Sequence, residues 1–80
     1  MTKRQRAQVV ELLRCAHEVH GIGAAAEYLE LYAGTEWGLA IKAWEDTSDA
    51  ILSRRGNLLG ITYEHVCLEA AQRVEDHQWP

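Results

Sequence analysis

Two histidines are the first candidates for metal chemistry, because His17 and His20 lie three positions apart. On a helix this spacing places both imidazole rings on one side, with Cys15 and Glu18 as further candidate ligands for zinc. A zinc site needs three or four ligands that converge, and neither of the other two histidines is expected to reach this pair in an antiparallel helical bundle. We therefore expect no bound metal and no other cofactor. A metal-dependent enzyme built on His17 and His20 ranks last among three functional hypotheses.

The nucleophilic residues give no sign of a catalytic centre. Cys67 and His65 lie two positions apart, a spacing that points their side chains away from each other on a helix. The chain contains no G-x-S-x-G turn and no Cys-x-x-Cys pair. We therefore predict that the protein is not an enzyme, and that Cys15 and Cys67 are reduced core thiols in a reducing cytoplasm.

Aromatic residues with a polar tip are numerous for so short a chain, which has three tryptophans, three tyrosines and no phenylalanine. Such side chains suit a partly wet interface with another protein. An alternative assigns Trp37 and Trp44 to the core and folds Trp79 back over one end of the bundle. The expected interface residues are Tyr28, Tyr32, Trp37, Trp44 and Trp79.

An acidic face is expected beside these aromatic residues, because residues 15–53 carry seven acidic side chains against one lysine. Charges of one sign attract and orient a partner of the other sign. The leading hypothesis is therefore a non-catalytic accessory protein that acts through protein contacts, either as a homodimer or with a basic protein partner. The acidic face comprises Glu27, Glu30, Glu36, Asp46 and Asp49.

The basic residues support a competing hypothesis, in which the chain binds nucleic acid through phosphate contacts. Residues 1–14 carry four basic residues and one acidic residue, and a second basic pair follows later in the chain. Against this hypothesis, the longest predicted helix opens with Thr35-Glu36-Trp37, so a recognition helix would present a carboxylate to the phosphates. The candidate nucleic-acid contacts are Lys3, Arg4, Arg6, Arg54 and Arg55.

Helices must position these side chains, because apolar residues recur at steps of three and four along most of the chain. Thr2 and Gln5 have the form of a capping box before the first helix. Gly34 is expected to close the second helix in a left-handed conformation, Thr35 to cap the third and Gly56 to end it. The predicted helices cover residues 3–20, 24–33, 35–55 and 62 onward, the last with Thr62 as its cap.

The composition is that of one packed domain, since 48% of the residues are hydrophobic, 25% are charged and only one is proline. No segment alternates between apolar and polar residues over strand length, so a sheet is not expected. We predict a single all-α domain over residues 1–80, a small four-helix, bundle-like fold with one short helix. The predicted core comprises Val9, Leu12, Leu13, Ala16, Tyr28, Leu31, Trp37, Ile41, Trp44, Ile51, Val66, Cys67, Ala70 and Val74.

The sequence predicts neither export nor membrane insertion. Its basic opening is not followed by the apolar stretch that a secretory signal needs, because Glu11 and Arg14 interrupt it. No run approaches the roughly 18 apolar residues of a membrane-spanning helix. The predicted location is the cytoplasm.

Two terminal segments carry a resemblance to a known group of proteins. They read Arg-Ala-Gln-Val-Val-Glu-Leu-Leu-Arg-Cys-Ala over residues 6–16, and Leu-Glu-Ala-Ala-Gln-Arg-Val-Glu from residue 68, continuing to Trp79 and Pro80. They resemble the framing segments of short proteins encoded by temperate bacteriophages and prophages. These relatives have no known activity, cofactor or catalytic residue. The resemblance implies a bacterial host cytoplasm and a protein that works by binding host or phage components.

Overall fold

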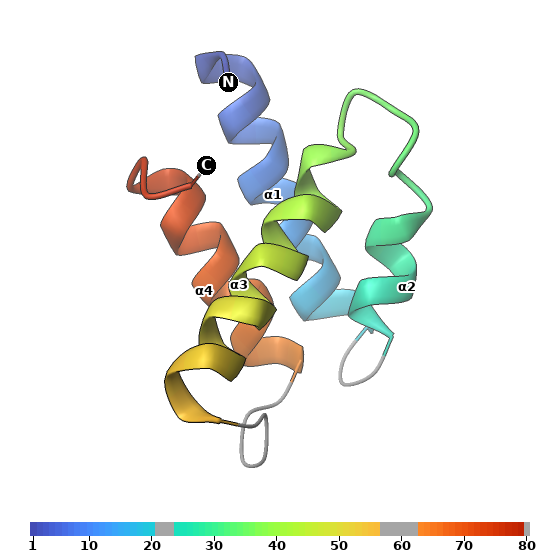
Figure 1. Ribbon diagram of the computed structural model, residues 1–80. Helices are drawn as coiled ribbons and strands as arrows, with labels where there is room; N and C mark the ends of the chain where they lie inside the picture. The colour runs from blue at the N-terminus through green and yellow to red at the C-terminus, as the bar shows by residue number, and fades with distance from the viewer. Residues whose placement is uncertain (21–23, 57–62, 80) are drawn as a thin grey trace.

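The computed structural model describes residues 1–20, 24–56 and 63–79, which form four α-helices and no strand (Figure 1). This confirms the predicted all-α, bundle-like domain with one short helix. The predicted cap at Thr62 and the side chains of His20, Arg55 and His65 lie outside the described part of the chain. The helices are α1 (Lys3–His20), α2 (Ala25–Glu30), α3 (Leu39–Arg55) and α4 (Tyr63–Glu75).

The first turn of α1 is fixed by two neighbouring side chains. The backbone N–H of Gln5 donates to Thr2 Oγ1 at 3.1 Å, and the backbone N–H of Thr2 donates to Gln5 Oε1 at 2.8 Å. This reciprocal pair is the predicted capping box, and it satisfies donors that a helix start otherwise leaves free. The start of α1 is therefore determined by residues three positions apart.

α1 and α4 form the most extensive helix pair and run antiparallel, so both ends of the chain lie at one end of the molecule (Figure 1). The Arg6 guanidinium group donates from Nη1 to the carbonyl oxygen of Val74 at 2.6 Å. Arg14 pairs with Glu75 at 2.6 Å, and the neighbouring Leu13 is fully buried in the core. A cation that reaches the last turn of a helix is favoured by the helix dipole, so Arg6 stabilises the end of α4.

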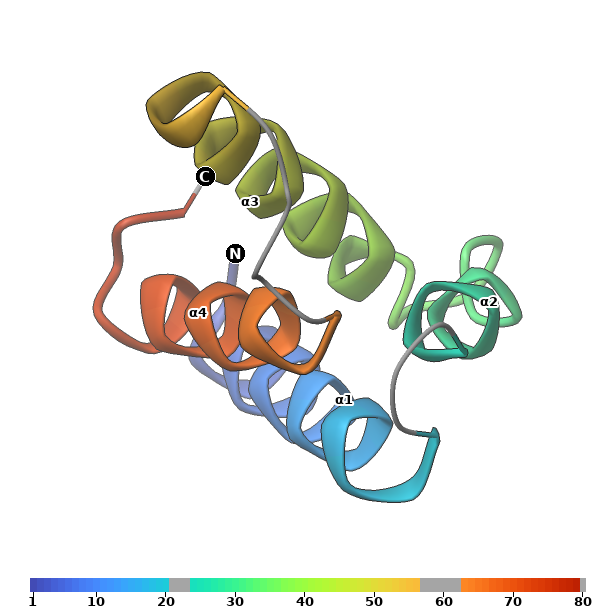
Figure 2. The same ribbon diagram turned by 90° about the horizontal axis from the view of Figure 1, so that it is seen from below.

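α3 forms a second layer over the α1–α4 pair, and α2 lies at one edge (Figure 2). α3 is antiparallel to α4, because Arg54 near its end pairs with Glu69 at 3.3 Å while Arg73 donates to Thr47 Oγ1 at 3.0 Å. Thr47 is fully buried, and a buried hydroxyl is costly unless it is hydrogen-bonded. Arg73 therefore satisfies the polar group that α3 places in the core.

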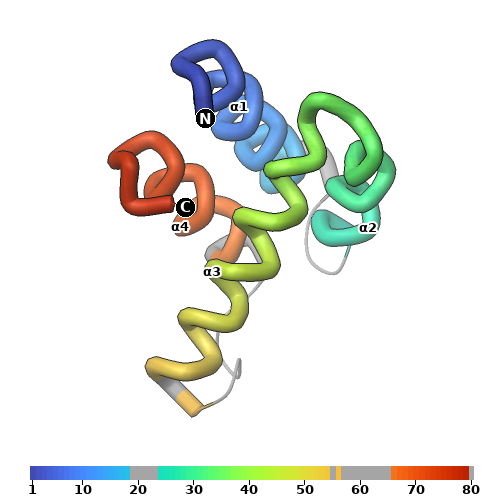
Figure 3. Tube along the Cα trace, turned by 45° about the horizontal axis from the view of Figure 1, so that its top comes forward, coloured from blue at the N-terminus to red at the C-terminus, as the bar shows by residue number. Residues whose placement is uncertain are grey.

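The second and third helices differ from the prediction. α2 ends at Glu30, and residues 31–38 arch over as a series of turns before α3 begins at Leu39 (Figure 3). Thr35 does not cap α3: its Oγ1 accepts from the backbone N–H of Trp37 at 3.1 Å and donates to the Tyr32 carbonyl at 2.7 Å. The predicted ranges 24–33 and 35–55 are therefore wrong at these boundaries, because Thr35 stabilises a turn between the two helices.

Glycines fix the two ends of α3 for different reasons. A Cβ atom on Gly38 would lie 2.4 Å from the carbonyl oxygen of Ala33, so the connection can approach this closely only at a glycine. Gly56 has φ 81°, which confirms that it ends α3 in the left-handed conformation. Gly34 does not adopt a positive φ, so the prediction that it closes α2 in this way is wrong.

α4 ends in a left-handed turn at a residue that is not glycine. His77 has φ 59°, its backbone N–H donates to the Val74 carbonyl at 3.2 Å, and the Gln78 N–H donates to the Arg73 carbonyl at 2.7 Å. These two bonds define a Schellman motif, which satisfies the last carbonyl groups of the helix. The turn reverses the chain toward α3.

The reversed tail buries its tryptophan. Trp79 is only 6% exposed, and its Nε1 donates to Asp46 Oδ2 at 2.9 Å. The other carboxylate oxygen of Asp46 pairs with Lys42 at 3.8 Å. Trp79 thus folds back onto the bundle. This is the alternative that assigns the tryptophans to the core rather than to an interface.

The core is continuous through all four helices but does not include every predicted residue. Leu31 is 77% exposed, whereas Leu29 is fully buried, so the prediction that Leu31 belongs to the core is wrong. A six-residue helix has fewer than two turns, so apolar spacing alone could not choose its buried face. Leu12, Tyr28 and Trp37 are half-buried. The buried hydrophobic residues are Val9, Val10, Leu13, Ala16, Ala25, Leu29, Ala40, Ile41, Ala43, Trp44, Ile51, Val66, Cys67, Ala70, Ala71, Val74 and Trp79.

Across residues 1–20, 24–56 and 63–79, no helix has both the length and the apolar character needed to cross a membrane.

Candidate functional site

The basic residues proposed for nucleic acid do not form one surface. Lys3 and Arg4 are exposed at the start of α1, while Arg54 is exposed at the end of α3, which lies at the opposite end of the molecule (Figure 1). Arg54 already pairs with Glu69, and Arg6 donates to a backbone carbonyl of α4. The Arg55 side chain is outside the described residues. The cations that the sequence groups together are therefore separated by the length of the bundle.

The histidine pair offers one described ligand only. His17 is half-buried, and its Nδ1 atom is buried with no hydrogen-bond partner among the residues that the structure describes. No three His, Cys, Asp or Glu side chains within the described ranges are grouped so that they could hold a metal ion. The side chain of His20 is not described. The structure therefore assembles no metal centre around His17 from the residues it describes.

The five aromatic residues predicted for an interface fall into two groups. Trp44 is 9% exposed and Trp79 is 6% exposed, so both lie in the core and leave little ring surface for a partner. Burial raises the pKa of the neighbouring Cys67 thiol to about 11, although a side-chain hydrogen bond with Trp44 lowers it in part. A buried thiol with this pKa stays protonated at neutral pH and is a poor nucleophile. Trp44, Trp79 and Cys67 therefore serve the packing of the bundle.

The other three aromatic residues form a continuous row on α2 and the connection that follows it. The rings of Tyr28 and Tyr32 meet edge to face with centroids 5.5 Å apart, and those of Tyr32 and Trp37 are tilted at 60° with centroids 5.3 Å apart. Aromatic pairs at these separations stabilise each other beyond their burial alone. All three residues are half-buried, so part of each side chain remains accessible.

The Tyr28 hydroxyl anchors this row to α1. It lies 3.8 Å from Cys15 Sγ, at hydrogen-bonding distance for sulfur. A hydrogen bond with Tyr32 raises the pKa of Tyr28 well above its usual value, and the Cys15 contact and burial act in the same direction. Tyr28 therefore remains protonated and holds the row of rings in place.

A groove runs between this row and one face of α1, with a volume of about 340 Å³. Its α1 wall was not predicted as a site, although positions 8, 11, 12 and 15 have the spacing that places them on one helical face. Its second wall comes from the two aromatic residues nearest to α3. We call it the aromatic groove, and its lining residues are Gln8, Glu11, Leu12, Cys15, Tyr32 and Trp37.

The segment that carries the aromatic residues is acidic, and its carboxylates have no ion-pair partner among the described residues. Glu27, Glu30 and Glu36 are exposed on the segment that carries the rings, and Glu11 is exposed in the groove. Among the described residues the ion pairs involve other carboxylates, those of Asp46, Glu69 and Glu75. Residues 25–38 include no lysine or arginine, so the segment bears a net negative charge.

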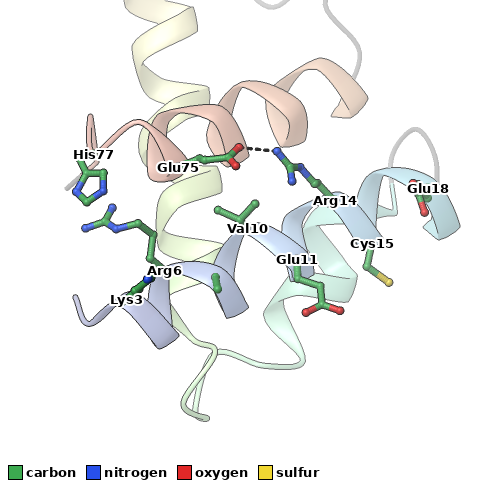
Figure 4. A pocket seen from close by; sticks show the side chains of 10 residues that line it. Lys3, Arg6, Val10, Glu11, Arg14, Cys15, Glu18, Glu75 and His77 are labelled. Atoms are coloured by element: carbon green, nitrogen blue, oxygen red, sulfur yellow. Dashed lines mark hydrogen bonds and ion pairs between the residues drawn. The ribbon is translucent and has the colours of Figure 1, made fainter.

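A second, larger groove of about 680 Å³ runs along α1 beside the end of α4 (Figure 4). Lys3, Arg6 and His77 lie toward one end and Glu18 toward the other, with Glu11 and Arg14 between them. The Arg14–Glu75 ion pair spans the space between the two helices. We call it the α1–α4 groove, and its lining residues are Lys3, Arg6, Ala7, Val10, Glu11, Arg14, Cys15, Glu18, Glu75 and His77.

Comparison of the chain with protein-family models, with curated proteins and with solved structures found no match. The function must therefore be argued from the two grooves and the chemistry of the side chains that line them.

Proposed function

We propose that this chain is a small, non-catalytic interaction module whose aromatic groove binds a basic segment of a protein partner. The observation that carries the proposal is the meeting of two half-buried rings, Tyr32 and Trp37, with the carboxylate of Glu11 in one groove. The ring faces attract cations, and an ion pair with Glu11 would fix where the cation binds. Lysine and arginine side chains match both features.

The charge of the surrounding surface favours the same partner. Glu27, Glu30 and Glu36 are exposed on the segment that supplies the aromatic wall, and no described cation neutralises them. A cluster of like charges speeds the encounter with an oppositely charged partner and disfavours acidic ones. The groove would therefore select for a partner with several basic residues.

Apolar contacts would supply the remaining affinity. Leu12 is half-buried in the groove, and Leu31 on the adjacent connection is 77% exposed. Aromatic and aliphatic side chains at the centre of an interface carry most of its binding energy, whereas charged residues at the rim act mainly on rate and specificity. A basic amphipathic helix of the partner would present both kinds of side chain on one face.

A second copy of the chain is the first alternative to a different protein, because residues 1–14 are themselves basic. Binding of one copy's basic segment in another copy's groove would join two different surfaces, and such contacts form rings or open chains unless they close. Light scattering distinguishes the two cases. A mass that rises with concentration would favour self-association over a separate partner.

The setting that we propose for this module is a bacterial cytoplasm. The resemblance of residues 6–16 and 68–80 to segments of phage-encoded proteins favours a host or phage protein as the partner.

A pair of synthetic peptides tests the proposal. One is an amphipathic helix of leucine with lysine and arginine, and the other has glutamate at every basic position. We expect the basic peptide to bind with a dissociation constant in the micromolar range and to shift the NMR signals of Trp37 and Tyr32, and the acidic peptide to leave them unchanged. Equal effects from both peptides, or no effect from either, would contradict the proposal.

Two matched variants locate the binding site on the chain. Glu11→Gln removes the carboxylate in the groove and is expected to weaken binding of the basic peptide about fivefold, since a charge-assisted contact contributes on the order of 1 kcal/mol at an exposed site. Glu45→Gln removes one charge from an exposed position on α3 that does not line the groove. Equal weakening by both variants would show general attraction rather than a site.

A further inference from the structure

The basic end of the α1–α4 groove brings together side chains from both ends of the chain. Figure 4 shows the Arg6 guanidinium group pointing toward His77, with Lys3 at the same end of the groove. The nearest acidic side chain drawn there, Glu75, is held by Arg14 at 2.6 Å. Lys3, Arg6 and His77 therefore line one end of the groove, and none of them is ion-paired with a described carboxylate.

Arg6 is held in position before any ligand binds. Its Nη1 donates to the Val74 carbonyl at 2.6 Å, and the residue is half-buried. A guanidinium group has five N–H donors, and this is the one hydrogen bond described for the Arg6 side chain, so other donors of the planar group remain for a ligand. A fixed, forked cation loses little conformational freedom when it binds an oxyanion.

The backbone conformation of His77 places its ring at this space. Its φ of 59° lies in the left-handed region, where a residue other than glycine is strained. Glycine would serve the turn at α4 without that cost, and a strained non-glycine residue in a groove is a recognised sign of function. The exposed imidazole ring lies beside the Arg6 guanidinium group and carries an N–H donor.

We infer that Lys3, Arg6 and His77 form a binding site for a phosphate group that ends a molecule, that is, a phosphomonoester or free phosphate. The guanidinium fork suits two phosphate oxygens, while a lysine ammonium group acts as a point charge and an imidazole N–H can donate to the third oxygen.

A terminal phosphate fits these observations better than a nucleic-acid backbone. The three side chains lie at one end of one groove, whereas a nucleic-acid backbone needs cations that follow successive phosphates. Arg54 lies at the other end of the bundle, and Arg14, farther along the groove, is paired with Glu75, so the described cations form no track that extends from the site. The inference does not depend on the proposed function, because Lys3, Arg6 and His77 do not line the aromatic groove, which shares only Glu11 and Cys15 with the α1–α4 groove.

Titration with inorganic phosphate at constant ionic strength, followed by heteronuclear NMR, tests the site. We expect saturable shifts of the Arg6 side-chain N–H and the His77 ring signals, with a dissociation constant in the millimolar range or below. Sodium chloride over the same range is expected to leave these signals unchanged. Shifts of equal size with chloride would overturn the inference, as would the absence of saturable shifts with phosphate.

Three variants separate a defined site from general attraction. Lys3→Gln removes one donor, and His77→Asn removes the ring while keeping a residue that tolerates the left-handed turn. Each is expected to weaken phosphate binding about tenfold, the effect of losing one charge-assisted contact. Arg4→Gln makes the same change in charge one residue away, outside the groove, and is expected to have little effect. Equal weakening by Lys3→Gln and Arg4→Gln would overturn the inference.

Three further probes identify the source of the phosphate. Free phosphoserine and a single-stranded oligonucleotide with a terminal phosphate are expected to compete with inorganic phosphate. The same oligonucleotide without its terminal phosphate is expected not to compete. Competition by the unphosphorylated oligonucleotide would show backbone binding and would overturn the assignment to a terminal phosphate.

Discussion

The α1–α4 pair and the connection between α2 and α3 keep their shapes by different means. The pair consists of long helices whose ends are fixed locally, by the capping box at Thr2 and by the left-handed turn at His77. The connection, residues 31–38, depends on the close fit of Gly38 against Ala33 and leaves Leu31 77% exposed. The comparison teaches that different parts of one small domain provide its stability and its accessible surface chemistry. The pair supplies more than half of the buried hydrophobic residues, while the connection presents accessible aromatic and acidic side chains.

The sharpest test of this division compares two leucines that the sequence places equally in the core. Leu13 on α1 is fully buried, so Leu13→Ala is expected to lower the free energy of unfolding by about 3 kcal/mol through lost burial and the cavity left behind. Leu31→Ala is expected to change it by less than about 0.5 kcal/mol because Leu31 is exposed. Urea unfolding followed by circular dichroism measures both. Similar losses would mean that the connection contributes to the core as much as the pair does.

The second test breaks the connection itself. Gly38→Ala is expected to destabilise the protein by about 2 kcal/mol, because the added Cβ would meet backbone atoms of Ala33 that cannot move without shifting the turn. Gly34→Ala is the matched control, since a Cβ there meets nothing within 4 Å and φ is not positive. The control is expected to be neutral, or stabilising by about 0.5 kcal/mol through a less flexible unfolded chain. Equal destabilisation by the two variants would contradict the close fit at Gly38.

The third test uses pH to examine the core between α3 and α4. Burial raises the pKa of Cys67 from 9.0 to about 11, so the unfolded chain loses this proton first as the pH rises. The contribution of the protonated thiol is fully present below about pH 9 and is lost between pH 9 and pH 11. We expect the free energy of unfolding to fall over this window by on the order of 1 kcal/mol more in the parent chain than in Cys67→Ala. Parallel pH profiles would show that Cys67 is not buried as described.

The smallest expected effect concerns the end of the α1–α4 pair. His77→Gly is expected to stabilise the chain by about 0.5 kcal/mol, because glycine adopts the left-handed conformation without strain but is more flexible when unfolded. Asp76→Gly, at an exposed neighbour without a positive φ, is expected to be slightly destabilising. Thermal unfolding shows whether each variant is more or less stable than the parent chain. A loss of stability in His77→Gly would show that the imidazole ring makes a stabilising contact at α4.

The candidate site could be predicted in part from the sequence. Tyr32 and Trp37 were named as interface residues, and the spacing of Gln8, Glu11 and Cys15 already places them on one face of α1. What the spacing did not reveal is that the α2–α3 connection lies over that face. The spacing also does not predict that Trp44 is buried while Trp37 lines the groove. Both fall on one stripe of the predicted third helix, but α3 starts only after Trp37.

For the α1–α4 groove, too, the sequence does not show which side chains of different helices come together. Lys3 and Arg6 were grouped with Arg54 and Arg55 by charge alone, although an antiparallel first and last helix should bring His77 to the N-terminal end instead. Only the hydrogen bond from Arg6 to Val74 and the turn at His77 show how closely the two ends meet.

The sequence by itself determined the four helices, the bounds of α1, the capping box and the end of α3 at Gly56. These features depend on backbone and side-chain groups within a few positions of each other, so local spacing is enough to specify them. The tertiary structure decided that Leu29 rather than Leu31 is buried, that α3 begins at Leu39 and that the basic residues lie at opposite ends of the bundle. These outcomes depend on contacts between residues as many as 68 positions apart, because burial and charge clustering are properties of how helices pack and not of any single helix.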